Sequence, residues 1–115
     1  MSITIRIPNW HPTFLNQLIN VHWAVANKRK KADSRLICTY MHHLPPATKK
    51  RRVKLAIILG KGQLAADPDA YQKSLGDALV HAGQLKNDSH LWVEWAPVKF
   101  LRGEMMTIIE LEDIE

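Results

Sequence analysis

The chain is short of cysteine, of long apolar stretches and, in its first half, of acidic residues, and each shortage excludes a class of protein. Cys38 is the only cysteine among the 115 residues, so an internal disulfide framework and a zinc site built from cysteines are excluded. No apolar run approaches the ~20 residues of a membrane-spanning helix, and the N-terminus has no signal-peptide pattern. We therefore expect a cytoplasmic protein without a membrane partner.

The length of the chain suits one domain. At 115 residues, folding buries roughly two-thirds of the surface that the unfolded chain exposes. The apolar fraction of 46% is ordinary for a globular protein, and the sequence contains no internal repeat or low-complexity segment. We predict a single domain that spans residues 1–115.

Charge is divided unevenly along the chain. Residues 1–64 carry twelve Lys and Arg and one acid, whereas residues 65–115 carry four bases and ten acids, so the formal charges of the two parts are +11 and −6. Either basic run of the first part would by itself suit a solvated helix or loop, but two runs in one small domain favour a nucleic-acid backbone. The residues predicted to bind DNA are Lys28, Arg29, Lys30, Lys31, Arg35, Lys49, Lys50, Arg51 and Arg52.

Apolar spacing predicts four strands, at residues 3–7, 53–59, 91–100 and 105–111. The last two are expected to form a hairpin through a turn at residues 101–104, and both faces of the second are expected to be covered. Residues 12–44 read as mostly helical, with a mobile loop at the basic run. The acidic C-terminal residues are interpreted as a solvated edge strand and terminus. The fold class that follows is α/β (α+β), a small mixed sheet of about four strands with helices packed on it.

A helix after residue 67 is marked by its own start and stop signals. Asp67 is a good N-cap, Pro68 suits the first helical position and Gly83 is a natural stop. Gly76, in the middle, costs ~1 kcal/mol relative to alanine, which the close approach of another element would explain. The stripe expected to pack on the core consists of Tyr71, Leu75, Ala78, Leu79 and Ala82.

Three carboxylates and one ammonium gather around this helix. Asp67 and Asp69 stand at its start, Lys73 follows one turn later, and Asp88 lies in a polar turn beyond its end. Carboxylate oxygens suit magnesium, which can activate water and stabilise a leaving oxygen, and Lys73 could neutralise a phosphate. An alternative is purely structural: Asp67 caps the helix, Asp69 offsets its dipole and pairs with Lys73, and Asp88 forms a turn.

The sequence of this helix and of the turn after it resembles the signature of the RusA-like Holliday junction resolvases, also called crossover junction endodeoxyribonucleases. That signature reads D-x-D-N-x-x-K, then a helix with D-A-L, a glycine and an aspartate. The clear similarity covers residues 53–98, and the first 50 residues match loosely through a short strand followed by Pro12-Thr13 and Asn16. The matching residues are Asp67-Pro68-Asp69-Ala70-Tyr71-Gln72-Lys73, Asp77-Ala78-Leu79, Ala82-Gly83 and Asn87-Asp88.

The resemblance implies a homodimeric, magnesium-dependent endonuclease, with Mn²⁺ as a substitute, that cuts paired strands of four-way DNA junctions. It implies that Asp67, Asp69 and Asp88 hold the metal and that Lys73 is the catalytic lysine. Where the family has an asparagine, this chain has Ala70. The side-chain amide that would support the metal ligands from behind is therefore missing. The alternative is a DNA- or RNA-binding protein that has this fold but no catalytic activity.

Overall fold

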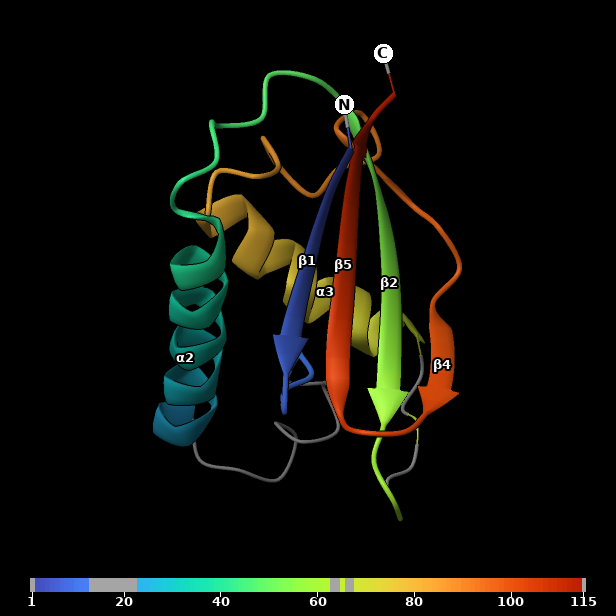
Figure 1. Ribbon diagram of the computed structural model, residues 1–115. Coiled ribbons are helices and arrows are strands. Elements are labelled where there is room, and N and C mark those ends of the chain that lie inside the picture. Colours follow the sequence, from blue (N-terminus) through green and yellow to red (C-terminus); the bar gives the residue numbers. More distant parts are fainter. Residues whose placement is uncertain (1, 13–22, 63–64, 66–67, 115) are drawn as a thin grey trace.

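A mixed sheet and two helices make up the described part of the protein (Figure 1). The structure, a computed structural model, describes residues 2–12, 23–62, 65 and 68–114. The predicted mixed α/β class is confirmed, with five strands in place of about four. The elements are β1 (Ser2–Pro8), α2 (Trp23–Met41), β2 (Arg51–Leu59), α3 (Pro68–His81), β3 (Val93–Trp95), β4 (Lys99–Arg102) and β5 (Met106–Asp113).

The sheet has the order β1-β5-β2-β3, and β4 pairs with β2 on the same side as β3. β5 is antiparallel to both of its neighbours, β1 and β2. β3 and β4 are parallel to β2, because the chain returns to β2 by way of α3, and a parallel pair needs such a crossover. α3 therefore connects β2 to the strand that flanks it, and its N-terminus follows the C-terminal end of β2.

The predicted hairpin between residues 91–100 and 105–111 is wrong. β2 lies between β4 and β5, and the turn that joins them crosses the end of β2 (Figure 1). There the N–H of Gly103 donates to the carbonyl of Leu59 at 3.0 Å. The single strand expected at 91–100 is also divided, into β3 and β4, by a segment that contains Pro97, which has no N–H for a strand ladder.

The acidic C-terminal segment does not form the edge strand that the sequence predicts. β5 pairs with β1 on one side and with β2 on the other along most of its length. Alternate residues of β5 are buried, and the acids Glu110 and Glu112 occupy the positions between them. The acids therefore lie on one face of the centre of the sheet.

The core lies on the face of the sheet that both helices cover. Every second residue of β2 is buried, and so is every second residue in the middle of β5. Leu75 and Leu79 of α3 and Ile37 and Met41 of α2 pack against them. Figure 1 shows α3 behind the sheet and no described helix in front of it. The expectation that both faces of residues 53–59 are covered is therefore wrong for the described part of the chain.

α2 differs from the sequence prediction, whereas α3 follows it. α2 is continuous through residues 28–31, so the basic run is helical and does not form the expected loop. α3 begins at Pro68 as predicted, while its predicted cap, Asp67, lies outside the described residues. Gly83 has a φ of +75° and donates to Val80, and Gln84 donates to Leu79, which together form the glycine-based helix stop that the sequence predicts. Neither helix is long and apolar enough to cross a membrane.

Candidate metal and phosphate site

A hollow of about 300 Å³ brings together three of the four predicted catalytic residues. Asp69 and Lys73 line it from α3, and Asp88 lines it from the turn before β3. All three side chains are at least partly exposed to solvent. The fourth predicted residue, Asp67, lies outside the described residues. The other lining residues are Gln72, Gly76 and Trp95.

Gly76 allows the wall of this hollow to approach the helix. A Cβ atom at position 76 would lie 3.2 Å from Cζ2 of Trp95 and 3.8 Å from Cβ of Asp88. Because a side chain at this position would meet both residues, glycine keeps the turn and β3 close to α3. This is the close approach that would account for a glycine in the middle of a helix.

Two lining residues of the hollow, Gln72 and Trp95, have no role in the sequence prediction. Gln72 lies three positions after Asp69, on the same side of α3, and its Nε2 donates to the carbonyl of Ala96 at 3.4 Å. That bond ties α3 to the segment after β3. Trp95 contributes a half-buried ring. The i, i+3 spacing is a usable signal for Gln72, but nothing in the local sequence indicates that Trp95 faces α3.

The charged groups of the hollow have no ionic partner in the described part of the chain. None of the ion pairs found there involves Asp69, Lys73 or Asp88. The i, i+4 pair between Asp69 and Lys73, part of the structural interpretation, is therefore not formed. The turn itself is stabilised by Asn87, whose side-chain oxygen accepts the N–H of Ser89 at 2.9 Å. Asp88 is thus not needed as the acceptor in that turn.

The two described carboxylates lie at different points along α3. Asp88 lies beside Gly76, and Gly76 follows Asp69 by seven residues, which is roughly 10 Å along a helix axis. Magnesium in proteins keeps several of its waters, so it can be held by one or two carboxylates with water completing its coordination. The described residues, which do not include Asp67, contain no group of three His, Cys, Asp or Glu side chains that could hold a metal.

The hollow has room for a hydrated cation. Its volume of about 300 Å³ corresponds to roughly ten waters of ~30 Å³ each, and magnesium in proteins keeps several of its waters. Asp69 and Asp88 supply oxygen ligands, and Lys73 stands between them along the helix as a partner for a phosphate. The donor set therefore fits magnesium that is held partly through water, with a phosphate alongside.

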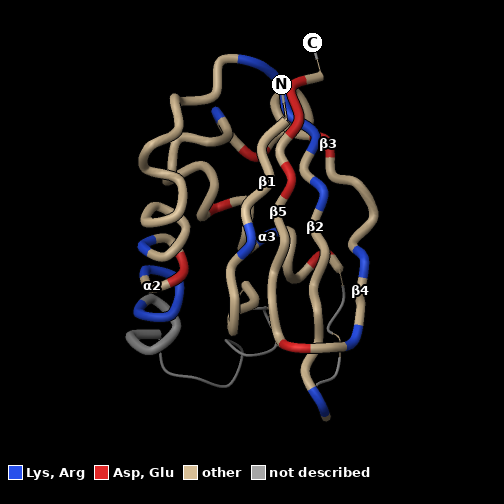
Figure 2. Tube along the Cα trace, viewed as in Figure 1, with Lys and Arg blue, Asp and Glu red and all other residues tan. Residues whose placement is uncertain are grey.

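The first basic run forms an exposed surface on α2. Lys28, Arg29, Lys30, Lys31 and Arg35 are all exposed. Figure 2 shows these bases on the lower part of α2, on the other side of the view from β3 and β4. Asp33, in the same helix, is buried and accepts a hydrogen bond from Nε1 of Trp10 at 3.2 Å. The run therefore presents positive charge to solvent at some distance from the strand that lines the hollow.

One residue of the second basic run, Arg51, is buried and not on the surface. Arg51 is 4% exposed. Its Nε donates to Asp113 at 2.9 Å, and its Nη1 donates to the carbonyl and to the side-chain oxygen of Gln84 at 3.0 and 2.9 Å. The guanidinium thus connects β2, β5 and the segment after α3, so its contacts in the structure are those of a structural residue.

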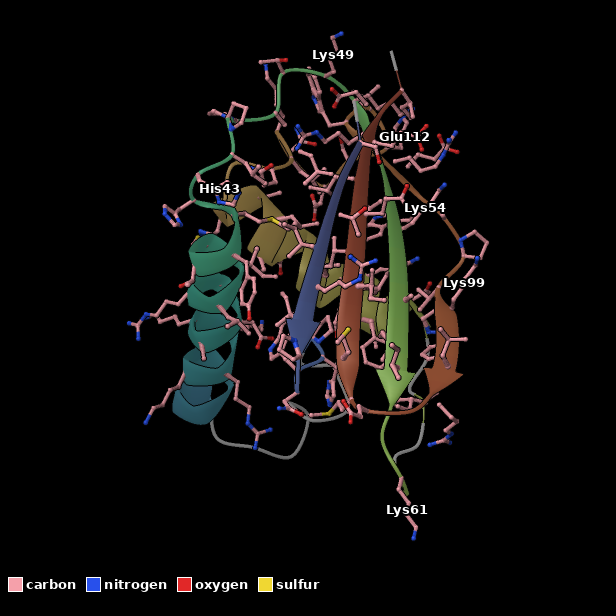
Figure 3. All side chains as sticks on the ribbon, viewed as in Figure 1. His43, Lys49, Lys54, Lys61, Lys99 and Glu112 are labelled. Carbon is pink, nitrogen blue, oxygen red and sulfur yellow. The ribbon has the colours of Figure 1, made fainter. Side chains whose placement is uncertain are left out.

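The remaining bases of β2 face acids across the sheet. Arg52 lies 3.5 Å from Glu94 and 3.8 Å from Glu112, and Lys54 lies within 4.0 Å of Glu110 and Glu112. Figure 3 shows Glu112 and Lys54 near the upper part of the sheet and Lys49 on the loop before β2. Arg52, predicted to bind DNA, is therefore already paired. Within that run, Lys49 and the half-buried Lys50 take part in no ion pair of the described residues.

Comparison with known proteins identifies no relative: no family model matches the chain, and no curated protein matches it.

Proposed function

We propose that the protein is a metal-dependent endodeoxyribonuclease of the RusA-like kind, which resolves four-way DNA junctions by hydrolysing a phosphodiester in each of two opposed strands. The observation that carries this proposal is the hollow in which Asp69, Lys73 and Asp88 meet without ionic partners among the described residues. The resemblance of residues 53–98 to the RusA-like signature supports the same activity.

Each residue of the hollow has a chemical task in this proposal. Asp69 and Asp88, with Asp67, would hold magnesium, which would supply an activated water and positive charge at the leaving oxygen. Lys73 places a positive charge beside the phosphate as negative charge develops in the transition state. The exposed bases of α2 hold the phosphate backbone of the DNA. In the proposed assembly, a homodimer supplies two equivalent sites to a junction that is itself nearly two-fold symmetric.

The test is cleavage of a synthetic four-way junction in the presence of magnesium or manganese. We expect paired nicks from the natural chain, and no nicks from Asp69→Asn or Asp88→Asn, each of which removes one ligand charge and keeps the shape of the side chain. Both variants should still bind the junction. Asp77→Asn is the matched control, because Asp77 is an exposed residue of α3 that does not line the hollow, and it should cut normally.

Two further measurements separate the tasks of the residues. Lys73→Ala should lower the cleavage rate more than it lowers junction affinity, because its task is at the transition state; an equal loss of both would make it an ordinary binding residue. Magnesium should also raise the melting temperature of the natural chain by mass action, and this rise should shrink in Asp69→Asn and Asp88→Asn but not in Asp77→Asn.

The alternative function is nucleic-acid binding without catalysis. One observation favours it: the exposed bases of α2 suit a phosphate backbone whether or not cleavage follows. The alternative would be established, and the nuclease overturned, by a natural chain that binds junctions tightly but makes no nicks with either metal. The melting temperature of that chain would also be unchanged by both metals.

A further inference from the structure

The face of the sheet that points away from the helices carries an apolar half and a charged half. Neither described helix lies in front of it (Figure 1), and the register of the strands shows which side chains it presents. Arg52, Lys54, Ala56 and Ile58 of β2 alternate with the buried residues of that strand. Their partners on β5 are the non-core residues Glu112, Glu110, Ile108 and Met106. We call this surface the open face.

One half of the open face is apolar. Ile58 is paired with Met106 on one side and with Leu101 on the other, and Met106 is paired in turn with Pro8. Ala56 and Ile108 form the adjacent row. Six side chains on four strands therefore make one contiguous patch, and Leu101 within it is 51% exposed. We define the apolar patch as Pro8, Ala56, Ile58, Leu101, Met106 and Ile108.

The other half of the open face carries charges of both signs in alternation. Arg52 and Lys54 stand among Glu94, Glu110 and Glu112 at distances of 3.5–4.0 Å. Arg6 and Lys99 flank the apolar patch in the row of Ala56 and Ile108. The acids lie close to bases throughout, so this half has no strong potential of one sign. A phosphate backbone is therefore a poor occupant of the open face.

We propose that the open face is the surface on which a second copy of this chain docks. In a two-fold interface the same patch faces itself, so each surface must be complementary to its own copy. An apolar patch satisfies this condition, and so does a rim of alternating acids and bases, in which an acid of one copy can meet a base of the other. Contiguous apolar surface bordered by polar residues is typical of protein interfaces.

The proposal supplies the surface for the homodimer of the proposed function but does not depend on nuclease activity. Self-association can therefore be measured by sedimentation equilibrium without DNA or metal, while cleavage is scored separately. A natural chain that dimerises but never cuts would refute only the nuclease. A natural chain that stays monomeric at micromolar concentration would refute this interface, whatever its activity.

The decisive variant is Leu101→Glu, with Leu91→Glu as its matched control. Leu101 and Leu91 are the two exposed large hydrophobic residues of the described chain, 51% and 66% exposed, but Leu91 lies in the turn before β3 and not on the open face. Leu101→Glu should raise the dimer dissociation constant about tenfold or more, the factor that the burial of one leucine represents. Leu91→Glu should leave the constant unchanged, and an equal effect of the two variants would overturn the proposal.

A second measurement keeps the test decisive if Leu101→Glu fails to fold. Ile108→Cys replaces a half-buried residue of the apolar patch with a small apolar one. A short thiol-specific cross-linker should join two copies of this variant covalently. The natural chain, whose only thiol is Cys38 of α2 on the helix side of the sheet, should give no cross-link. Equal cross-linking of both chains, or of neither, would refute docking through the open face.

Discussion

Replacement of Arg51 by methionine should lower the stability of the protein and leave its affinity for DNA nearly unchanged. The sequence assigns Arg51 to a basic run that binds phosphates, whereas the structure buries its guanidinium against Asp113 and Gln84. Methionine keeps most of the length of the side chain and removes the charge and the three hydrogen bonds. The variant therefore distinguishes a structural arginine from a DNA-binding one.

The expected loss follows from the hydrogen bonds of the guanidinium. Removal of one partner of a buried ion pair costs ~3–5 kcal/mol, and here the lower end applies because the side chain of Asp113 is 21% exposed and can be hydrated. The side-chain and carbonyl oxygens of Gln84 lose their donor at a residue that is fully buried, which also costs energy. Burial of the methionine offsets part of this. We expect the free energy of unfolding to fall by about 3 kcal/mol.

Urea denaturation followed by circular dichroism measures this loss. With a slope of ~1.5 kcal/mol per molar urea, typical of a small domain, the midpoint should fall by about 2 M without a change in slope. Lys54→Met is the matched control, since Lys54 is an exposed base of the same strand whose ion pairs lie at 3.8 and 4.0 Å. Such pairs contribute at most ~1 kcal/mol.

The opposite pattern would refute the reasoning. A loss of less than ~1 kcal/mol in Arg51→Met would be no larger than the contribution of a surface ion pair. Such a result would mean that the guanidinium is not held as the structure shows. A stable variant that also loses its affinity for DNA would return Arg51 to the phosphate-binding set.

Two further predictions concern α3 and α2. Gly76→Val should lower the free energy of unfolding by ~1–3 kcal/mol, because the new side chain meets Trp95 and Asp88, and it should also slow cleavage. The control is Asp77→Val at the exposed neighbouring position. It should change the free energy of unfolding in urea by less than ~1 kcal/mol, through helix propensity alone. Replacement of residues 28–31 by alanine should flatten the dependence of log affinity for DNA on log salt by roughly 3–4, about 0.9 for each phosphate that is no longer neutralised. An unchanged salt slope would place that run away from the DNA, and Lys54→Ala is the variant in which no change is expected.

The elements that the sequence predicts well are those whose signals are local. α3 is marked by Pro68 at its start and by Gly83 at its end, and both act as expected. The alternation of apolar residues likewise locates β1, β2 and β5 to within two residues. Such signals need only the neighbouring residues, because helix caps and strand faces are properties of a few consecutive positions.

The errors concern which elements lie next to each other. The residues 101–104 carry the signals of a tight turn, but nothing local says whether the strands on either side pair with each other or flank a third strand. The same lack of tertiary information explains why the sequence assigns Arg51 to a surface run. A run of bases looks uniform in sequence, yet β2 is central, so alternate residues point into the core and toward the open face. Only the tertiary arrangement separates Arg51, which is buried, from Lys54, which is exposed.

The charged residues of the hollow can be selected from the sequence, but their spacing cannot. Residue type and resemblance select Asp69, Lys73 and Asp88, and the structure places all three on one hollow. Their separation depends on where the turn before β3 meets α3, and Gly76 fixes that point. A contact between a glycine and two residues 12 and 19 positions away cannot be read from periodicity, since helical spacing relates only residues within a few turns.

If both proposals hold, the dimer interface must leave the two sites where one junction can reach both. The hollow is lined by Trp95 of β3, in the outermost column of the sheet on that side. If a two-fold axis lies between two facing sheets and runs across the strands through the apolar patch, both β3 edges lie on the same side of the dimer. Facing sheets are ~10 Å apart and a helix layer adds about as much on each side, which separates the two hollows by roughly 30 Å across the layers. Trp95 is paired with Val53, about four residues or ~13 Å along the strand from the apolar patch, so the hollows would be roughly 40 Å apart in total and accessible from one side. An axis along the strands would place the two β3 edges on opposite sides, where one junction could not meet both sites without wrapping around the dimer. With the axis across the strands, spin labels at Asp77→Cys, with Cys38 replaced by serine, should lie roughly 40 Å apart, and a pair of labels much farther apart would exclude concerted cutting through this interface.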